Sequence, residues 1–455
     1  MALNNPLYTV KDSLLAHRVC LFAVSSINFH LSISRQSRSK KQLDYSKEDS
    51  ISVPLVNMED LGLLQLSRES PYYYKRQLRN PCLCYERTAP LALAASIPRA
   101  ETPTTFSEVT IFSPPSDYVI PRTLYARNLQ LPNGDLLATW ENYSPEPPAV
   151  YFPIYRSTDS GKTWSELSRV EDTANGLGLR YQPFLYYLEE SIGSYEAGTI
   201  LLAGSSIPTD LATTQIDLYA SRDSGVTWEF VSHIAAGGEA LPNNGLTPVW
   251  EPFLLAHNGK LICFYSDQRQ NETYGQKLVH QTTTDLKNWG DVIDDVTYPT
   301  YTDRPGMPVV TKLPTGEFIM TYEYGSFFGT SDYSFPVYYR ISADPENFLA
   351  APHQKLVVSS GTQPTGSPYN VWTPFGGDNG TLVVSCGNLG SVFVNQALGE
   401  GEWTEISTPE SASYTRSLRI LQEKENYLLL NGGGVLQGES NKVTVSVMDL
   451  EAALA

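Results

Sequence analysis

Two glutamates in the body of the chain have aromatic and apolar neighbours. Glu251 lies in the segment VWEPF and Glu323 in the segment TYEYG. A carboxylate in such a setting is costly unless it is paired or used in chemistry. Two carboxyl groups beside aromatic rings suit hydrolysis of a glycosidic bond, because the rings supply stacking faces for a sugar. For either glutamate alone, an ion pair with an arginine such as Arg304 explains the residue equally well.

Both glutamates belong to a pattern that recurs six times beyond residue 105. In each copy an aromatic-rich strand leads into a turn, often Asn-Gly or Thr-Gly, and a short apolar strand follows. Such a turn between alternating apolar stretches predicts a β-hairpin. A third strand and a Trp-containing segment come next, which gives four strands per unit. The copies begin at Tyr125, Tyr181, Trp250, Gly306, Trp372 and Thr415.

Six such units predict an all-β fold, namely a six-bladed β-propeller with four-stranded antiparallel blades. An open ring would leave sheet edges exposed. We therefore expect the early strand at residues 106–112 to complete the sixth blade beside the C-terminal strand at residues 442–450. The propeller domain is expected to span residues 105–455. Residues 1–104 are expected to be a largely disordered, processed or unusual extension. A β-sandwich is the alternative fold.

Alignment of the six units shows where one blade differs from the others. The strand-entry positions are occupied by Gln182, Glu251, Met307 and Thr373, so only the third blade has a carboxylate there. The ends of the second strands are occupied by Glu141, Ser205, Ser266, Glu323, Cys386 and Gly432. This alignment predicts that Glu251 and Glu323 lie on neighbouring blades near the channel mouth. Glu141 is a third candidate, but the sequon at Asn142 makes an exposed loop position at least as good an explanation.

A motif of the form Ser-x-Asp-Ser-Gly-x-Thr-Trp occurs at residues 157–164 and again at residues 221–228. Each copy follows a third strand. Its Ser and Asp can accept backbone hydrogen bonds in a turn, its Gly permits a positive φ, and its Trp can pack beneath the loop. The motif is the Asp-box found in sialidases and other propellers. It predicts that Asp159 and Asp223 stabilise turns on the outer rim and take no part in catalysis. Weaker versions occur at Asp285 and Asp344.

Roughly residues 105–450 resemble glycoside hydrolase family 93, the fungal exo-arabinanases that form six-bladed propellers. The resemblance rests on the segments TPVWEPFLL, LICFYSDQR, YGQKLVHQTTTDL, DRPGMPVV and TYEYG. It implies hydrolysis of α-1,5-linked L-arabinan from the non-reducing end, with release of arabinobiose and retention of anomeric configuration. It also implies that Glu251 and Glu323 are the catalytic pair and that no metal or cofactor is needed. We favour Glu251 as nucleophile and Glu323 as acid/base, although the sequence hardly separates these roles.

Further residues are expected to line the channel at the strand entries. For each of them, packing between blades explains the residue as well as contact with a ligand does. Those expected to bond sugar hydroxyls are Arg127, Gln182, Arg304, Asn370 and Arg416. Those expected to stack on sugar faces are Tyr181, Trp250, Tyr322, Tyr324 and Trp372. Asp267 is expected to hold a hydroxyl or to orient Arg269.

Charge and composition narrow the range of partners. The net charge is −17, and no basic stripe with interleaved aromatic residues offsets it. We therefore expect no nucleic-acid partner. No run of about 18 apolar residues is present, so no membrane span is expected. A monomer that binds arabinan is expected.

Several features of the sequence are consistent with secretion. Residues 88–100 resemble the end of a signal peptide. Three sequons, at Asn142, Asn271 and Asn379, permit glycosylation. Cys263 and Cys386 lie in apolar runs and are expected to be buried free thiols.

Two other functions remain as alternatives. A sialidase shares the propeller and the Asp-boxes, and Arg122, Arg304 and Arg416 are available for its arginine triad. That chemistry gives the glutamate of VWEPF no role. A propeller that binds a glycan or protein without catalysis is the second alternative, and it needs no pair of carboxylates.

Overall fold

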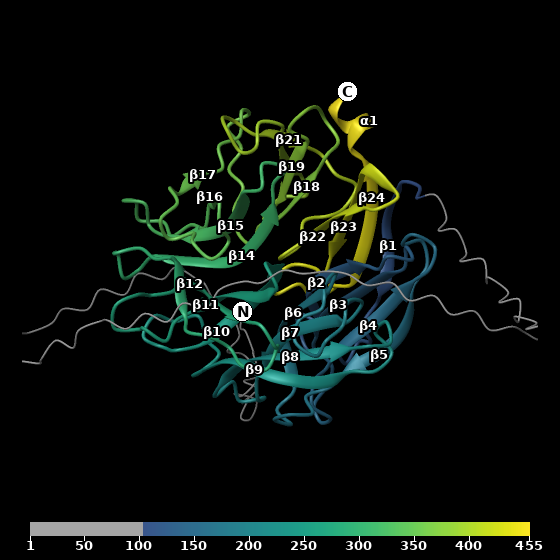
Figure 1. Cartoon of the computed structure of the whole chain (residues 1–455), viewed down its shortest axis with the longest axis vertical. Coiled ribbons are helices and arrows are strands. Elements are labelled where there is room, and N and C mark those ends of the chain that lie inside the picture. The colour runs from purple at the N-terminus through teal and green to yellow at the C-terminus, as the bar shows by residue number, and fades with distance from the viewer. Residues whose placement is uncertain (1–102) are drawn as a thin grey trace, which may run out of the picture. The chain divides into compact units, whose positions relative to one another are not determined.

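Six four-stranded antiparallel sheets surround a central axis in the computed structural model, which describes residues 103–455. Figure 1 shows these sheets as the blades of a ring. The predicted six-bladed propeller is confirmed. The predictions for residues 1–102 lie outside the described residues.

The first strand of each blade lies nearest the axis, and the later strands follow outward in chain order except where the ring closes. The first blade comprises β2 (Thr123–Gln130), β3 (Leu136–Asn142), β4 (Phe152–Ser157) and β5 (Ser165–Val170). The second comprises β6 (Leu179–Tyr187), β7 (Ile200–Ser206), β8 (Thr214–Ser221) and β9 (Glu229–Gly237). The third comprises β10 (Val249–His257), β11 (Lys260–Asp267), β12 (Lys277–Thr283) and β13 (Ile293–Val296). The fourth comprises β14 (Arg304–Lys312), β15 (Phe318–Gly325), β16 (Val337–Ser342) and β17 (Gln354–Lys355). The fifth comprises β18 (Tyr369–Thr373), β19 (Thr381–Ser385), β20 (Val392–Asn395) and β21 (Thr404–Ile406). The sixth comprises β22 (Ser417–Leu421), β23 (Lys424–Gly432), β24 (Val443–Asp449) and β1 (Phe106–Phe112). A short helix, α1 (Leu450–Leu454), follows.

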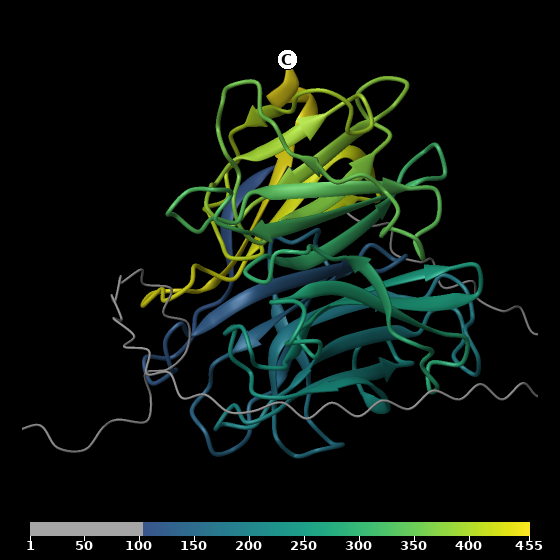
Figure 2. The ribbon, with the colours of Figure 1, turned by 90° about the vertical axis from the view of Figure 1, so that its left-hand side faces the viewer.

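The ring closes as the sequence predicts. β1 pairs with β24, with Thr110 opposite Thr444, so the first described strand forms the outer edge of the sixth blade. Figure 2 shows the same two strands side by side from a second direction. This pairing joins the two ends of the described chain and removes the open edge that a broken ring would expose.

Apolar faces of neighbouring blades pack against each other and form most of the core. The ring centroids of Phe184 in the second blade and Phe253 in the third lie 4.5 Å apart. Cys263 and Cys386 are buried free thiols, as expected. Within residues 103–455, the structure has no helix of the length and apolarity that a membrane span needs.

The two Asp-boxes are turns between the third and fourth strands, as predicted. Asp159 accepts hydrogen bonds from the backbone N–H of Thr163 at 2.9 Å and from its hydroxyl at 2.6 Å. The indole N–H of Trp164 donates to the carbonyl of Gly161 at 2.9 Å. Asp223 makes the same pair of contacts with Thr227. These carboxylates are therefore held in turn geometry.

The three sequons differ in exposure. Asn379 is exposed in the β18–β19 turn and Asn271 is partly exposed, whereas the side chain of Asn142 is buried, with 3% of its surface exposed. Asn142 belongs to β3, so the explanation of an exposed loop for this segment is wrong. A glycan has no room at a buried strand residue, which leaves the other two sequons as accessible positions.

Candidate active site

Glu251 lies at the entry of β10, where the strand carries an irregularity between Trp250 and Phe253. Its φ of +64° falls in the left-handed region, which turns its side chain out of the regular strand alternation. Oε2 accepts hydrogen bonds from the hydroxyl of Ser266 at 2.5 Å and from the backbone N–H of Met307 at 2.8 Å. Two donors on one oxygen hold the carboxyl group in a fixed orientation.

Glu323 lies near the end of β15, in the next blade, and is partly exposed. Its Oε2 accepts the backbone N–H of Ser367 at 2.7 Å. Between the two glutamates lies Gly306, where a Cβ would be 3.3 Å from Glu323 Oε1 and 3.4 Å from Glu251 Oε2. These two oxygens can be no farther apart than the sum of those distances. That limit on one pair of oxygens is compatible with the carboxyl separation of about 5–5.5 Å in retaining glycosidases and lies at the short end of the inverting range of about 6.5–9.5 Å.

The environments of the two carboxyl groups differ. Burial, followed by the charge of Glu251, raises the pKa of Glu323 to about 7. Burial also raises the pKa of Glu251, but the Ser266 hydroxyl, the Met307 N–H and the charges of Arg304 and Arg127 oppose that rise. Glu251 thus has more groups that stabilise its ionised form, while Glu323 is suited to hold a proton.

A third carboxyl group, that of Glu141, shares this region. It is 3% exposed, and its two oxygens accept the hydroxyl of Tyr143 at 2.7 Å and the backbone N–H of Gln182 at 3.0 Å. Burial raises its pKa to about 7, and the charge of Glu251 contributes to the rise. Glu141 is therefore a buried channel residue, and the sequence left it outside the expected catalytic pair.

Hydrogen bonds link these groups from blade to blade. Gln182 gives its backbone N–H to Glu141 and, through its side-chain oxygen, receives the N–H of Glu251 at 3.2 Å. In the same way Ser367 receives the N–H of Thr415 at 3.0 Å. Each of these N–H donors belongs to a residue with positive φ at a strand entry, and its acceptor is a side chain of the preceding blade. The six residues with positive φ around the channel are Tyr125, Gln182, Glu251, Met307, Ser367 and Thr415.

This linkage corrects the alignment of the fifth blade. Its strand-entry residue is Ser367, not Thr373, because Thr373 lies at the far end of β18 opposite Thr381. Trp372 lies at the same far end and donates its indole N–H to Asn379, so its expected place at the sugar site is wrong. Asn370 is also committed elsewhere, since its amide donates to Val309 and Thr321.

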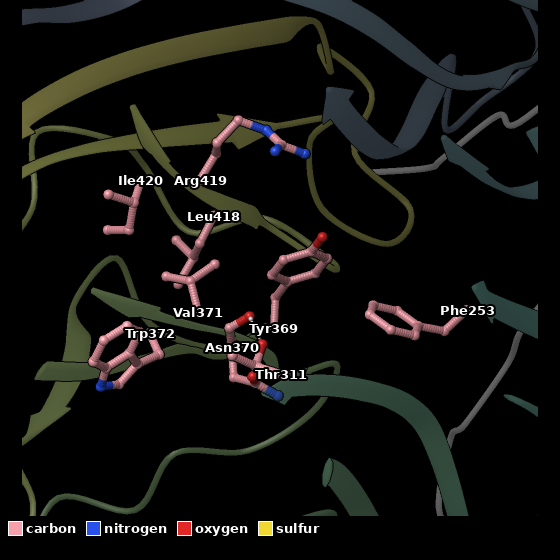
Figure 3. A pocket seen from close by; sticks show the side chains of 9 residues that line it. All are labelled: Phe253, Thr311, Tyr369, Asn370, Val371, Trp372, Leu418, Arg419 and Ile420. Carbon is pink, nitrogen blue, oxygen red and sulfur yellow. Dashed lines mark hydrogen bonds between the residues drawn. The ribbon is translucent and has the colours of Figure 1, made fainter. Parts of the chain in front are cut away.

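The far half of the channel holds a separate cavity of about 200 Å³ between β10, β14, β18 and β22. Figure 3 shows Asn370 and Trp372 at its wall together with Arg419, with Phe253 across from them. Glu251 and Glu323 do not line this cavity, so it is distinct from the carboxylate site.

Several predicted residues do surround the carboxylates. Arg127 is 4% exposed, bonds the carbonyl of Thr415 at 2.8 Å and lies 4.1 Å from the ring of Tyr125. Arg304 contributes a charge near both glutamates but bonds amides and a carbonyl, so it forms no direct ion pair with either. Tyr181, Gln182 and Trp250 lie at the entries of β6 and β10, each 7–8% exposed.

Three predicted contacts are wrong because side chains alternate along a strand. Tyr322 and Tyr324 point away from the face that carries Glu323. Tyr322 is fully buried with its hydroxyl 2.8 Å from that of Tyr298, while the ring of Tyr324 stacks on Tyr298 at 3.9 Å. Asp267 lies next to Ser266 in β11 and binds Arg269 through both oxygens, so only its expected role in orienting Arg269 is confirmed.

Arg416 is also misplaced by the sequence alignment. Its guanidinium is fully buried and donates to the backbone carbonyls of Gly390 at 2.7 Å and Ser391 at 2.6 Å. It therefore ties the connections of blade five together and is closed to a ligand. Arg122 bonds the carbonyls of Glu439 and Pro115. The arginine triad of a sialidase is consequently not assembled.

The sequence missed three residues that complete the site: Tyr125, Tyr143 and Ser367. Tyr125 lies close enough to Glu141, Glu251 and Glu323 for the charges of all three carboxyl groups to raise the pKa of its hydroxyl. Its position at the strand entry was a usable signal, whereas Ser367 had none because its segment has no aromatic residue before it. No cluster of His, Cys, Asp and Glu suited to a metal ion occurs in the part of the chain that the structure describes.

A propeller channel with two fixed carboxyl groups that face the same point at Gly306 is the arrangement of a glycoside hydrolase. Comparison with protein-family models gave no match, and no curated protein matched the chain. Among solved structures, the α-L-arabinanase of Penicillium chrysogenum, complexed with arabinobiose, is 73% identical, covers 77% of this chain and 100% of its own, and has a TM-score of 0.77. The GH93 α-L-arabinofuranosidase of Fusarium graminearum, also with arabinobiose, is 57% identical over 77% of this chain and 99% of its own, with a TM-score of 0.76.

The chain belongs to glycoside hydrolase family 93 and is an α-L-arabinanase or arabinofuranosidase-type glycosidase. The NanB sialidase of Streptococcus pneumoniae is 12% identical over 77% of this chain and 72% of its own, with a TM-score of 0.52. That likeness shows the propeller fold alone.

Proposed function

We propose that this enzyme hydrolyses α-1,5-linked L-arabinan from the non-reducing end and releases arabinobiose, with Glu251 as nucleophile and Glu323 as acid/base. The observation that carries the proposal is the placement of both carboxyl groups around Gly306, each within contact distance of the same point. Arabinobiose bound to the Penicillium and Fusarium enzymes supports a disaccharide product.

In the first step the Glu251 carboxylate attacks the anomeric carbon and the glycosidic C–O bond breaks. Glu323 gives its proton to the departing oxygen, so the shortened polymer leaves as an alcohol and an ester joins arabinobiose to Glu251. In the second step Glu323, now ionised, takes a proton from water, and the resulting oxygen attacks the anomeric carbon. The ester breaks, which frees arabinobiose with retained configuration and restores both carboxyl groups.

The hydrogen bonds to Glu251 suit the nucleophile. Ser266 and the N–H of Met307 hold Oε2, while Glu323 makes only one backbone hydrogen bond and keeps its other oxygen toward the gap. Partial exposure of Glu323 also gives water a route for the second step.

The experiment compares Glu251→Gln and Glu323→Gln on linear arabinan and on an aryl arabinobioside with an acidic phenol as leaving group. Both variants should lose at least about 10³-fold of kcat on arabinan. On the aryl substrate Glu323→Gln should regain formation of the glycosyl-enzyme, because that leaving group needs no proton. Glu251→Gln should stay inactive. Glu317→Gln, at the turn end of the same β14–β15 hairpin, is the matched control. Near-normal rates in both site variants would end the proposal.

We also propose that the enzyme acts outside the cell, since Asn379 offers an exposed sequon. N-terminal sequencing of protein from its native source tests this. A cytosolic product that retains Met1 would contradict it.

A further inference from the structure

Three aromatic side chains are exposed in one sector of the propeller. Tyr301 is 39% exposed, Phe327 40% and Phe328 41%, and within residues 103–455 no other Phe, Tyr or Trp side chain reaches this exposure. A gathering of exposed aromatic residues marks a binding surface more than single scattered ones do. We call Tyr301, Phe327, Phe328 and their neighbour Tyr333 the aromatic rim.

One ring contact and the hydrogen bonds of two tyrosines link the segments that carry the aromatic rim. The ring of Phe327 lies 4.9 Å from that of Tyr333, and the Tyr333 hydroxyl donates to the carbonyl of Thr302 at 2.7 Å. Tyr301 precedes Thr302, and its own hydroxyl donates to the carbonyl of Asn271 at 2.7 Å. The rim thus joins the β13–β14 connection to the β15–β16 connection.

Two members of the aromatic rim, Tyr333 and Tyr301, are tied to the active site. A Cβ at Gly325 would lie 2.9 Å from the Tyr333 hydroxyl, which places that side chain against the strand end two residues beyond Glu323. Asn244 bonds the carbonyl of Tyr301 at 3.2 Å and accepts from Arg304 at 2.7 Å. The charges of Arg304 and Glu323 both act on Tyr333. The rim therefore borders the mouth beside the proposed acid/base.

The loop that carries Phe327 and Phe328 is held in place. Ser326 and Ser334 form a bridge that closes it. Phe328 has a φ of +48°, which is uncommon for a bulky residue, and its ring lies parallel to that of Tyr338 within 4°. Strain of this kind persists where the surrounding structure fixes the residue, often at sites that bind ligands. A fixed aromatic surface binds with little loss of side-chain freedom.

We propose that the aromatic rim binds the arabinofuranosyl units on the leaving-group side of the scissile bond, an inference that rests on the proposed function. An enzyme that releases a disaccharide from the chain end buries two units, so the rest of the polymer must pass out of the mouth beside the acid/base. The rim lies on that path next to Glu323. Its exposed members are uncharged, which suits a neutral polysaccharide, and their rings offer faces for the C–H side of a furanose.

The test compares Phe327→Ala with the wild-type enzyme on two substrates. Linear arabinan places sugar units on the leaving-group side, while an aryl arabinobioside places none there. KM for arabinan should rise about 3- to 10-fold, the effect of one lost stacking contact, with kcat nearly unchanged. The kinetics on the aryl arabinobioside should stay within about twofold of wild type. Tyr301→Ala should give the same split from the other end of the rim.

Leu349→Ala is the control, because Leu349 is 47% exposed in the same blade but follows the end of β16 that lies away from Glu323. An unchanged KM for arabinan in both rim variants would overturn the proposal. An equal loss on both substrates would also overturn it, because the rim would then shape the catalytic pocket itself. If the wild-type enzyme releases no arabinobiose from either substrate, the proposed function itself fails, and the assignment of the aromatic rim fails with it. If the wild-type enzyme is active and only the rim variants contradict the expectation, the assignment of the rim fails and the proposed function stands.

Discussion

Replacement of Gly306 by alanine tests whether the space between the carboxyl groups is where the reaction occurs. The new methyl carbon would lie 3.3 Å from Glu323 Oε1 and 3.4 Å from Glu251 Oε2, with both charges intact. The anomeric carbon must approach the nucleophile to about 3–3.5 Å, and a displacement of about 1 Å costs about 100-fold in rate. A methyl group in this gap displaces the sugar by at least that much. We therefore expect kcat/KM on arabinan to fall by about 100-fold or more.

The fold should tolerate this change. Gly306 has no positive φ that an alanine would strain, and the nearest atom is the side-chain nitrogen of Gln276 at 2.9 Å. That amide donates to the carbonyl of Pro305 at 2.9 Å and must shift, which costs about 1–3 kcal/mol, while the loss of glycine flexibility in the unfolded chain offsets about 0.4–1 kcal/mol. Stability should thus fall by no more than about 3 kcal/mol.

The assay is steady-state release of arabinobiose, with thermal unfolding measured on the same samples. Gly290→Ala is the control. Gly290 lies in the β12–β13 connection, and a Cβ there would have its closest neighbour at 3.5 Å. Activity within threefold of wild type in Gly306→Ala, with an intact melting curve, would refute the placement of the reacting sugar between Glu251 and Glu323.

Three other changes have clear expected outcomes. The rate of the first step should fall as the pH rises through about 7, because Glu323 must be protonated and burial raises its pKa to about 7. Because the pKa of Glu323 is raised in the folded state, its contribution to stability is full below about pH 4.5 and is lost as the pH rises through about 7. Measurements of kcat and melting temperature over a pH series check both expectations. Because burial raises the pKa of Glu141 to about 7, its carboxyl group is mostly protonated on the acidic limb, so Glu141→Gln should leave the acidic limb of kcat/KM in place, and a shift of that limb to lower pH would show that Glu141 is ionised there and acts on Glu251. Asp159→Ala should lower the free energy of unfolding by about 1–2 kcal/mol through loss of its turn hydrogen bonds and leave kcat unchanged; a large drop in kcat would return this Asp-box to the catalytic machinery.

The sequence predicted the architecture well because blade formation is local. Each hairpin lies within a few dozen residues, and its turn residues and apolar periodicity are visible without any knowledge of distant contacts. The same pattern set the register of blades one to four, which is why Glu251 and Glu323 were found. In blade five the repeat lost its aromatic entry, and the register slipped from Ser367 to Thr373.

Side-chain direction was harder to predict than position. Tyr322 and Tyr324 flank Glu323 in sequence, yet alternation along β15 sends them to the other face. Arg416 stands at a strand entry, but buried carbonyls of blade five capture its guanidinium. The direction of a side chain depends on which hydrogen-bond acceptors lie near it in space. Neighbouring residues in the sequence do not reveal those acceptors.

The sequence by itself therefore determined the number of blades, the turns that join their strands and the residue types available for glycosidase chemistry. Tertiary structure alone decided which of these groups meet. Packing of the blades brings Gly306 between two glutamates, sets the N–H of Ser367 on Glu323 and places Glu141 where the charge of Glu251 acts on it. The physical reason is that Glu251 meets Gly306, and Glu323 meets Ser367, across different blades, so these contacts exist only once the apolar faces of neighbouring blades have packed and fixed their relative height.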